Sequence, residues 1–310
     1  EGLKGDEVVD SWTIYSVGGG ALANEASRLE TPRSIYPLST ISEIKEWCYH
    51  EGKTFWEYVS DCEGPEIWDY LDTVWETMCA TIQRGLNNDG VLPGGLKVAR
   101  KASTYWVKSK SYTDSLSSRA KIYAYALATS EENASGGTVV TAPTCGSSGV
   151  MPAVLYHLST SRNFLRIRIL RALATAGLFG NVAKTNSSIS GAEVGCQGEV
   201  GVACAMAAAA ACQLFGGTPS QIEYAAEMGL EHHLGLTCDP VCGLVQVPCI
   251  ERNAIAAARA FDANAYATLS DGSHMVSFDK VVEVMNETGH ALPSLYRETS
   301  EGGLAKRFKR

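Results

Sequence analysis

Cysteines beside turn-forming residues are the part of this sequence that most clearly suggests chemistry. The chain has ten cysteines. Four lie in or next to Gly, Asp and Pro residues, where the backbone can bend thiolates towards a shared point: Cys196, Cys238, Cys242 and Cys249. Cys204 and Cys212 instead fall within an alanine-rich run, and we expect both to be buried core residues, as free cysteines often are. The loop cysteines are therefore the candidates for a functional site.

Composition and charge narrow the possible functions. The 310 residues are 45% hydrophobic and 19% charged, so the chain can bury a sizeable core in one large domain or two. The formal net charge of -8 and the pI near 5.3 argue against a nucleic-acid or membrane-surface partner, because both favour basic patches. A small polar substrate or a protein partner is favoured instead.

The number of cysteines does not by itself indicate disulfides. A disulfide framework is typical of short secreted chains with a signal peptide, and the residues after Glu1 show no signal-peptide pattern. The longest apolar run, residues 200–215, falls short of the roughly 20 residues that span a bilayer, so we expect a buried helix there and no membrane partner. We expect a cytoplasmic protein with reduced thiols. Because residue 1 is not Met, we also expect a fragment or a processed form.

Helical signals dominate the chain. Thr40 and Thr54 are expected helix caps, and Thr218-Pro-Ser-Gln221 combines a capping box with Pro at the first helical position. Helices are predicted at residues 41–50, from 55 onward, and at 65–83, 113–131, 151–158, 166–179, 200–215, 219–232, 250–267 and 278–288. Short strands are predicted near residues 12–17 and 138–141. The sequence therefore predicts an all-α fold, mainly helical with a few short strands.

Two loops of small residues could bind an anionic group through their backbone N–H groups. The first is Gly18-Gly-Gly20, which follows a β-prone run, although a flexible linker explains three glycines equally well. The second is Thr144-Cys-Gly-Ser-Ser-Gly149, which precedes a predicted helix, although a close-packed turn explains it equally well.

Several long sequence strings resemble one protein family. The strings are Thr141-Ala-Pro-Thr144, Ser188-Ile-Ser-Gly-Ala-Glu-Val-Gly-Cys-Gln-Gly-Glu-Val-Gly201, Leu236-Thr-Cys-Asp-Pro240, Gln246-Val-Pro-Cys-Ile-Glu-Arg-Asn253 and Tyr296-Arg-Glu-Thr-Ser-Glu-Gly-Gly-Leu304. They closely resemble the catalytic α domain of the iron-sulfur-dependent L-serine dehydratases, and the resemblance runs from about Ser11 to Leu304. By this resemblance, residues 1–35 are a strand-containing lead-in from a regulatory domain or subunit, and residues 36–310 are the helical iron-sulfur catalytic domain.

The resemblance implies an oxygen-sensitive [4Fe-4S] cluster held by Cys196, Cys238 and Cys249. The spacing between these cysteines differs from the tight repeats of electron-transfer ferredoxins, and a structural zinc site would need short CxxC hooks with a fourth ligand. Cys242 could also bind a metal by its spacing from Cys238, but in the family this position is small and does not bind the cluster, which favours Cys249.

Three protein ligands would leave one iron open, and the family's chemistry uses that position. An open iron is a Lewis acid that can bind the substrate's β-hydroxyl group and make it a better leaving group. A base then removes the Cα proton, and loss of water gives aminoacrylate, which becomes pyruvate and ammonia. The resemblance implies no pyridoxal phosphate.

The resemblance also nominates residues that contact the substrate, an amino acid. Candidate substrate-binding residues are Gly18, Gly19, Thr144, Cys145, Ser147, Ser148, Asn186, Ser188, Arg252 and Arg297, and candidate catalytic residues are His232 and Ser190. Helix caps and turn hydrogen bonds are an equal explanation for the serines and for Asn186. His232 is expected to end a helix, where an imidazolium would favour the helix dipole anyway.

The two arginines have alternative roles that the sequence leaves open. Arg252 and Arg297 could each bind the substrate carboxylate bidentately, or could equally hold a glutamate that we expect to be buried. The glutamates in question are Glu193, Glu199 and Glu298.

Departures from the family pattern keep other functions open. Cys145 stands where the family has Asn or Ala, and the chain lacks the tail cysteine that closes the cluster in some members. Cys145 could be a ligand or substrate contact, or a buried thiol filling an Asn-sized space. These departures suggest an alternative enzyme with the same cluster that acts on cysteine or threonine.

A non-enzymatic iron-sulfur sensor is a further alternative, but the charge of -8 disfavours the DNA-binding surface that it would need. The partners that the resemblance implies are a β regulatory domain or subunit and further copies of this chain.

Overall fold

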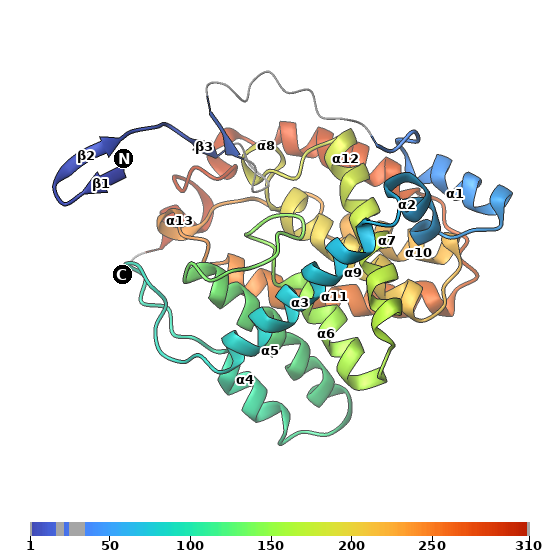
Figure 1. Ribbon diagram of the computed structural model, residues 1–310, viewed down its shortest axis with the longest axis horizontal. Coiled ribbons are helices and arrows are strands. Elements are labelled where there is room, and N and C mark those ends of the chain that lie inside the picture. The colour runs from blue at the N-terminus through green and yellow to red at the C-terminus, as the bar shows by residue number, and fades with distance from the viewer. Residues whose placement is uncertain (1, 17–21, 25–34, 309–310) are drawn as a thin grey trace.

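The computed structural model describes residues 2–16, 22–24 and 35–308, and its architecture is mainly helical. Figure 1 shows the helices gathered into one body, with a small hairpin projecting from it. Strands in the described residues form two short antiparallel pairs. These are β1 (Gly2–Lys4) with β2 (Glu7–Asp10) and β3 (Tyr15–Ser16) with β4 (Leu22–Ala23). The all-α prediction is confirmed.

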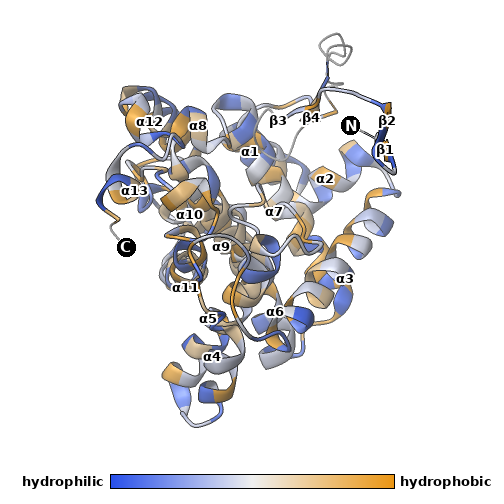
Figure 2. Cartoon of the chain, turned by 90° about the vertical axis from the view of Figure 1, so that its left-hand side faces the viewer, coloured by the Kyte–Doolittle hydropathy of each residue, from blue (hydrophilic) through white to orange (hydrophobic). Residues whose placement is uncertain are grey.

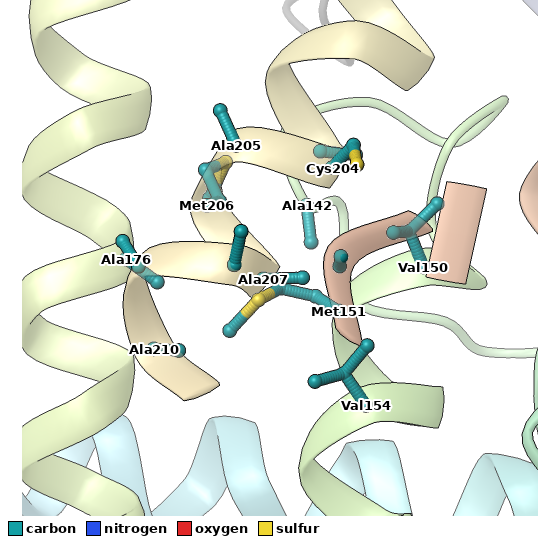
Figure 3. Packing of buried hydrophobic residues seen from close by; sticks show 14 of the residues in the cluster. Ala142, Val150, Met151, Val154, Ala176, Cys204, Ala205, Met206, Ala207 and Ala210 are labelled. Atoms are coloured by element: carbon teal, nitrogen blue, oxygen red, sulfur yellow. The ribbon is translucent and has the colours of Figure 1, made fainter. Parts of the chain in front are cut away.

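The alanine-rich helix α9 (Val202–Leu214) forms the centre of the protein, and nearly all of its residues are buried. Four helices pack directly against it: α6 (Val150–Arg162), α7 (Arg166–Asn186), α10 (Pro219–Glu231) and α11 (Cys249–Leu269). Figure 3 shows Ala205, Met206 and Ala207 of α9 beside Met151 of α6. Because alanine side chains are small, the axes of these helices can approach closely. Cys204 and Cys212 are fully buried in this helix, as expected.

The remaining helices surround this centre. They are α1 (Ile41–Glu51), α2 (Phe55–Glu63), α3 (Ile67–Leu86), α4 (Ala102–Ser109), α5 (Asp114–Ala134), α8 (Gly191–Val194), α12 (Phe278–Ala291) and α13 (Gly303–Arg307). Figure 2 shows hydrophilic residues on the outward faces of outer helices such as α3, as amphipathic helices require. Capping boxes start α1 at Thr40 and α10 at Thr218, and Glu57 accepts a hydrogen bond from the Thr54 backbone at the start of α2.

The structure corrects several predicted boundaries. Residues 138–141 form no strand, because the Thr138 carbonyl accepts hydrogen bonds from the side chains of Thr81 (2.8 Å) and Arg84 (2.7 Å). Helix α4 was not predicted; the carboxylate of buried Glu131 accepts hydrogen bonds from the backbone N–H groups of Lys101 and Ala102 at its start. The first hairpin was also missed. Helix α7 continues to Asn186, well beyond its predicted end.

No helix in the described residues is both long enough and apolar enough to cross a membrane. This agrees with the expectation that residues 200–215 form a buried core helix.

Two helical glycines provide a test of the close packing. At Gly85 in α3, an added Cβ would lie 2.3 Å from the carbonyl oxygen of Ala128 in α5, whereas at Gly177 in α7 nothing lies within 4 Å. We expect Gly85→Ala to lower the free energy of unfolding by about 1 to 3 kcal/mol, because two backbones must separate. Gly177→Ala should leave it unchanged or raise it by about 0.5 to 1 kcal/mol, since alanine favours the helix. Urea denaturation of both variants measures the difference, and equal stabilities would contradict the close approach of α3 and α5.

Candidate active site

Of the three cysteines that the family resemblance singled out, two lie at helix starts and one lies in a loop. Cys196 lies between α8 and a π-helical turn, η2 (Gln197–Gly201), which continues directly into α9. Cys238 lies in the loop after α10, and Cys249 is the first residue of α11. Cys196 and Cys238 are buried, and Cys249 is partly buried. Segments far apart in the sequence thus bring three thiols into one region.

The pKa shifts of these thiols include contributions from one another, which indicates that the thiols are neighbours. Burial, the largest cause, raises the pKa of Cys196 to about 11 and that of Cys249 to about 12, and raises the pKa of Cys238 further still. The Cys196 thiol contributes to the upward shifts of the other two. The guanidinium of Arg252 acts in the opposite direction on Cys196 and Cys249. Arg252 therefore favours the thiolate form at two of the three positions.

Glu199 links this group to the small-residue loop that precedes α6. Its Oε1 accepts a hydrogen bond from the Thr144 hydroxyl at 2.9 Å, and its Oε2 lies 3.8 Å from the Cys238 Sγ. Burial is the main cause that raises the pKa of Glu199 to about 7. Gly191 makes room for these contacts, since a Cβ there would lie 2.7 Å from Glu199 Oε2 and 3.0 Å from Cys238 Sγ. A carboxylate, a hydroxyl and a thiol therefore meet at one point.

Asn253 fixes the same loop to the first turn of α11. Its Oδ1 accepts a hydrogen bond from the Gly149 N–H (2.9 Å), and its Nδ2 donates to the carbonyls of Gly146 (2.7 Å) and Cys249 (2.9 Å). The residue is fully buried. Within the loop, the hydroxyl groups of Thr144 and Ser147 lie 3.0 Å apart. The loop is therefore held in place relative to Cys249 by a fully buried amide.

Gln197 joins the turn at Cys196 to the loop that carries Cys238. Its Nε2 donates to the carbonyls of Val194 (2.8 Å) and Met285 (3.2 Å). Its Oε1 accepts from the Gly235 N–H (2.9 Å) and the Thr288 hydroxyl (3.1 Å). A fully buried amide with all of these partners is costly to disturb, because moving any one of them leaves a buried polar group unpaired.

A C-terminal segment covers the Cys238 loop. The Cys238 N–H donates to the Tyr296 carbonyl (2.8 Å), and the Glu298 N–H donates to the Cys238 carbonyl (2.6 Å). Asp239 accepts a hydrogen bond from the Leu304 N–H (2.5 Å) and lies 3.7 Å from an Arg252 nitrogen. The backbone around Cys238 is thus paired with residues some 60 positions later in the chain.

The two arginines contact backbone carbonyls and Asp239, and their binding of the substrate carboxylate stays a prediction. Arg252 donates to the Thr237 carbonyl at 2.6 Å and faces Asp239. The expected acidic partner was a glutamate, whereas the structure pairs Arg252 with this aspartate. Arg297 donates to the backbone carbonyl of Glu193 at 3.0 Å, and its buried Nε has no hydrogen-bond partner in the described residues. The expectation that Glu193 and Glu298 are buried is wrong, because both residues are exposed.

The predicted serine and asparagine contacts are mainly local. The Asn186 amide donates to the carbonyls of Ser39 (2.7 Å) and Val182 (3.1 Å), and the Ser188 hydroxyl accepts from the Ser190 N–H (3.0 Å). Ser190 precedes Gly191, which lies against Cys238. Ser148 is buried, and its hydroxyl has no partner in the described residues. These contacts place Ser190 beside the thiol region, and Asn186 joins α7 to the Ser39 segment.

His232 lies at the surface. Its Nδ1 is 2.9 Å from the Met228 carbonyl and 3.4 Å from a Glu231 carboxylate oxygen. It borders a cavity of about 400 Å³ that Arg252 also lines. Within the described residues no hydrogen bond joins His232 to the cysteines, and its role as the base stays a prediction.

The two unusual cysteines, Cys145 and Cys242, are both exposed. The expectation of a buried Cys145 thiol filling an Asn-sized space is therefore wrong. The adjacent Gly146 lies against Glu199, with 3.1 Å from an added Cβ to the carboxylate, so Cys145 borders the site. Cys242 adopts a φ of 57°, which turns the chain away after Pro240. Gly18 and Gly19 lie outside the described residues.

The donor set suits a metal cluster bound through thiolates. Within the described residues, no three His, Cys, Asp or Glu side chains converge closely enough to hold a single metal ion. Thiols bound to a cluster sit on separate iron atoms, so a wider arrangement is compatible with one. Two of the thiols also lie at helix N-terminal ends, where the helix dipole favours thiolates. Cys196, Cys238 and Cys249 therefore fit the ligand set that the resemblance implies.

Comparison with known proteins shows which family the chain belongs to. Residues 20–305 match the family described as serine dehydratase alpha chain. The chain is 47% identical to L-serine dehydratase 1 of Escherichia coli K12, over 97% of this chain and 70% of that protein. It is 46% identical to the L-serine dehydratase of Streptomyces coelicolor, over 97% and 69%, and 39% identical to that of Helicobacter pylori J99, over 98% and 70%. The chain therefore belongs to the serine dehydratase alpha chain family.

Proposed function

We propose that the protein is an L-serine ammonia-lyase that converts L-serine to pyruvate and ammonia by α,β-elimination, with a [4Fe-4S] cluster and without pyridoxal phosphate. The observation that carries the proposal is the electrostatic coupling of Cys196, Cys238 and Cys249, with Glu199 joining Cys238 to the Thr144 loop. The names of the relatives, all L-serine dehydratases, support the substrate.

The chain's own residues would hold the cluster and orient the substrate beside it. When bound, the cluster supplies a Lewis acid for the departing hydroxyl group. The thiolates of the three cysteines would bind it, and Arg252 offsets part of their negative charge. The loop with Thr144, Ser147 and Ser148 is joined to the Cys238 thiol through Glu199. Its hydroxyl groups would bind a zwitterionic amino acid.

Glu199 has a positioning role in this proposal. It accepts the Thr144 hydroxyl hydrogen on one side and faces the Cys238 thiol on the other, so it sets the distance between the substrate loop and a cluster ligand. Asn253 sets the same loop against Cys249 from a second direction. Two buried polar side chains thus hold the loop against two different cysteines.

The proposed partners are a β regulatory domain or subunit and further copies of the chain. An exposed apolar surface supports a partner near the N-terminal hairpin, where the exposed side chains include Leu3, Val8, Val9 and Trp12. Size-exclusion chromatography with light scattering tests self-association.

Anaerobic purification followed by product assays tests the proposed reaction. We expect L-serine to give equal amounts of pyruvate and ammonia, with lower rates for L-threonine and L-cysteine. Added pyridoxal phosphate should leave the rate unchanged. A faster reaction with cysteine, releasing sulfide, would favour the desulfidase alternative. No ammonia from any of the three amino acids would contradict the proposal.

Substitution of the cysteines tests the ligand set. We expect Cys196→Ala, Cys238→Ala and Cys249→Ala each to lose the visible absorbance of the cluster and the activity together. Cys204→Ala is the matched control, because it removes a buried thiol from α9 at a cost of about 1 kcal/mol in unfolding free energy while keeping full iron content. A full [4Fe-4S] complement in any of the first three variants would remove that residue from the ligand set.

Thr144 provides a test of the loop. Thr144→Val keeps the side-chain shape but removes the hydroxyl that donates to Glu199, so we expect kcat/KM for serine to fall about tenfold or more. Thr144→Ser keeps the hydroxyl and should stay close to the wild type. Iron content and the thermal midpoint, measured for both variants, separate a loop effect from loss of cluster or fold. Wild-type kcat/KM in the valine variant would show that the hydroxyl does not position the loop.

A further inference from the structure

A second cavity is lined by α10, by Tyr266 near the end of α11 and by the loop that precedes α12. Its volume is about 610 Å³, a size that suits a small-molecule ligand. Its walls carry carboxylates, imidazoles and phenol rings: Glu227, Glu231, His232, His274, Tyr224 and Tyr266. No cysteine borders the cavity, and among the described lining residues there is no lysine or arginine.

Glu227 is the unusual residue of this cavity. Only 4% of its surface is exposed, yet within the described residues its carboxylate has neither a hydrogen bond nor an ion pair. Glu223, one helical turn earlier, is also buried but is satisfied by Lys45 and by the backbone N–H of Phe278 at 3.2 Å. Burying a carboxylate without a partner is costly. The Glu227 carboxylate reaches the cavity, where a ligand from outside the chain can pair with it.

The surroundings of Glu227 favour a positively charged partner. Burial, followed by the neighbouring carboxylates of Glu231 and Glu223, raises the pKa of Glu227 to about 7. The other titratable groups that line the cavity are the imidazoles of His232 and His274 and the phenols of Tyr224 and Tyr266. A cation placed here would meet two carboxylates and no fixed positive charge.

The aromatic walls favour an organic cation over a metal ion. Tyr224 stacks on His274 with ring centroids 4.6 Å apart and meets Tyr266 edge to face at 5.9 Å. The Nδ1 of His274 lies 2.9 Å from the Gly272 carbonyl, which fixes the ring. Aromatic rings beside a carboxylate recognise organic ammonium groups. The cavity contains no group of three His, Cys, Asp or Glu side chains, within the described residues, arranged to hold a metal ion.

We propose that this cavity binds a small primary ammonium compound, with Glu227 as the anionic partner of the ammonium group and Tyr224 and Tyr266 as its walls. The proposal does not rest on serine dehydration, because Glu227, Tyr224 and Tyr266 have no part in the proposed reaction, although the candidate base His232 also lines the cavity. Its chemistry also differs from that of the Thr144 loop, which has no aromatic wall among the residues that hold it.

Isothermal titration of the purified full chain with n-propylammonium chloride tests this site. The probe has no carboxylate and no β-hydroxyl group, so it shares only the ammonium group with the serine of the proposed active site. We expect saturable binding with one ammonium per chain, and binding of n-propanol at least about tenfold weaker, because the alcohol has the same size but no charge. Equal affinities for the two compounds, or no saturable binding of the ammonium, would overturn the proposal without any variant.

Substitution then identifies the anionic partner. Glu227→Gln keeps the size of the side chain and should weaken n-propylammonium binding about tenfold or more. Glu287→Gln is the matched control, because it makes the same charge change on the exposed surface of α12, outside the cavity. Its affinity should equal that of the wild type. Wild-type affinity in Glu227→Gln, or equal weakening in the control, would show that the general acidity of the protein attracts the probe.

Discussion

The close approach of α9, α10 and α11 is the constraint on which the candidate site depends. At Gly229 in α10, an added Cβ would lie 2.9 Å from the Ala205 Cα in α9, so these helices touch through their backbones. On the other side, the Cys204 thiol lies 3.4 Å from the Ala256 carbonyl near the start of α11, and the Cys212 thiol lies 3.8 Å from the Thr268 hydroxyl near its end. Helices α9 and α11 therefore run parallel, and α10 runs antiparallel to both. The starts of α9 and α11 and the end of α10 consequently meet at the same end of the bundle, where the three cysteines lie. Larger side chains in α9 would separate these ends and with them the thiols.

Much of this arrangement could be predicted from local sequence. The capping boxes at Thr40 and Thr218 gave the starts of two helices, and the alanine run gave the buried centre, because these signals act within a few residues. The family strings pointed to Cys196, Cys238 and Cys249, which the structure brings into one region. The strand predicted at residues 138–141 failed because the Thr138 carbonyl is satisfied by side chains of α3, which no local pattern reveals.

The side chains that complete the site were beyond the reach of sequence patterns. Glu199 was considered only as a partner for an arginine, yet it contacts Thr144 and Cys238, which are 55 and 39 positions away in the chain. Asn253 is the last residue of the string that begins at Gln246, and the sequence assigned no chemistry to it, although its amide joins residues more than 100 positions apart. Such contacts depend on the packing of whole helices. The surface position of Glu193 was missed for the same reason, since its string contains mostly small and apolar residues.

The turn at Cys196 shows how stability and function are coupled in this protein. Helix α9 is preceded by a π-helical turn, a feature that is rare and often occurs at functional sites. Gln197 lies in this turn, and its side-chain amide forms hydrogen bonds with α8, with α12 and with the loop before Cys238. The irregular backbone is therefore fixed from three sides. Glu199, two residues later, is free to face the cysteine site because Gln197 carries the structural hydrogen bonds. Gln197 fixes the backbone of the turn, and Glu199 places its carboxylate beside the Cys238 thiol. Without the hydrogen bonds of Gln197, we expect the turn to change its conformation and move Glu199 away from the thiol.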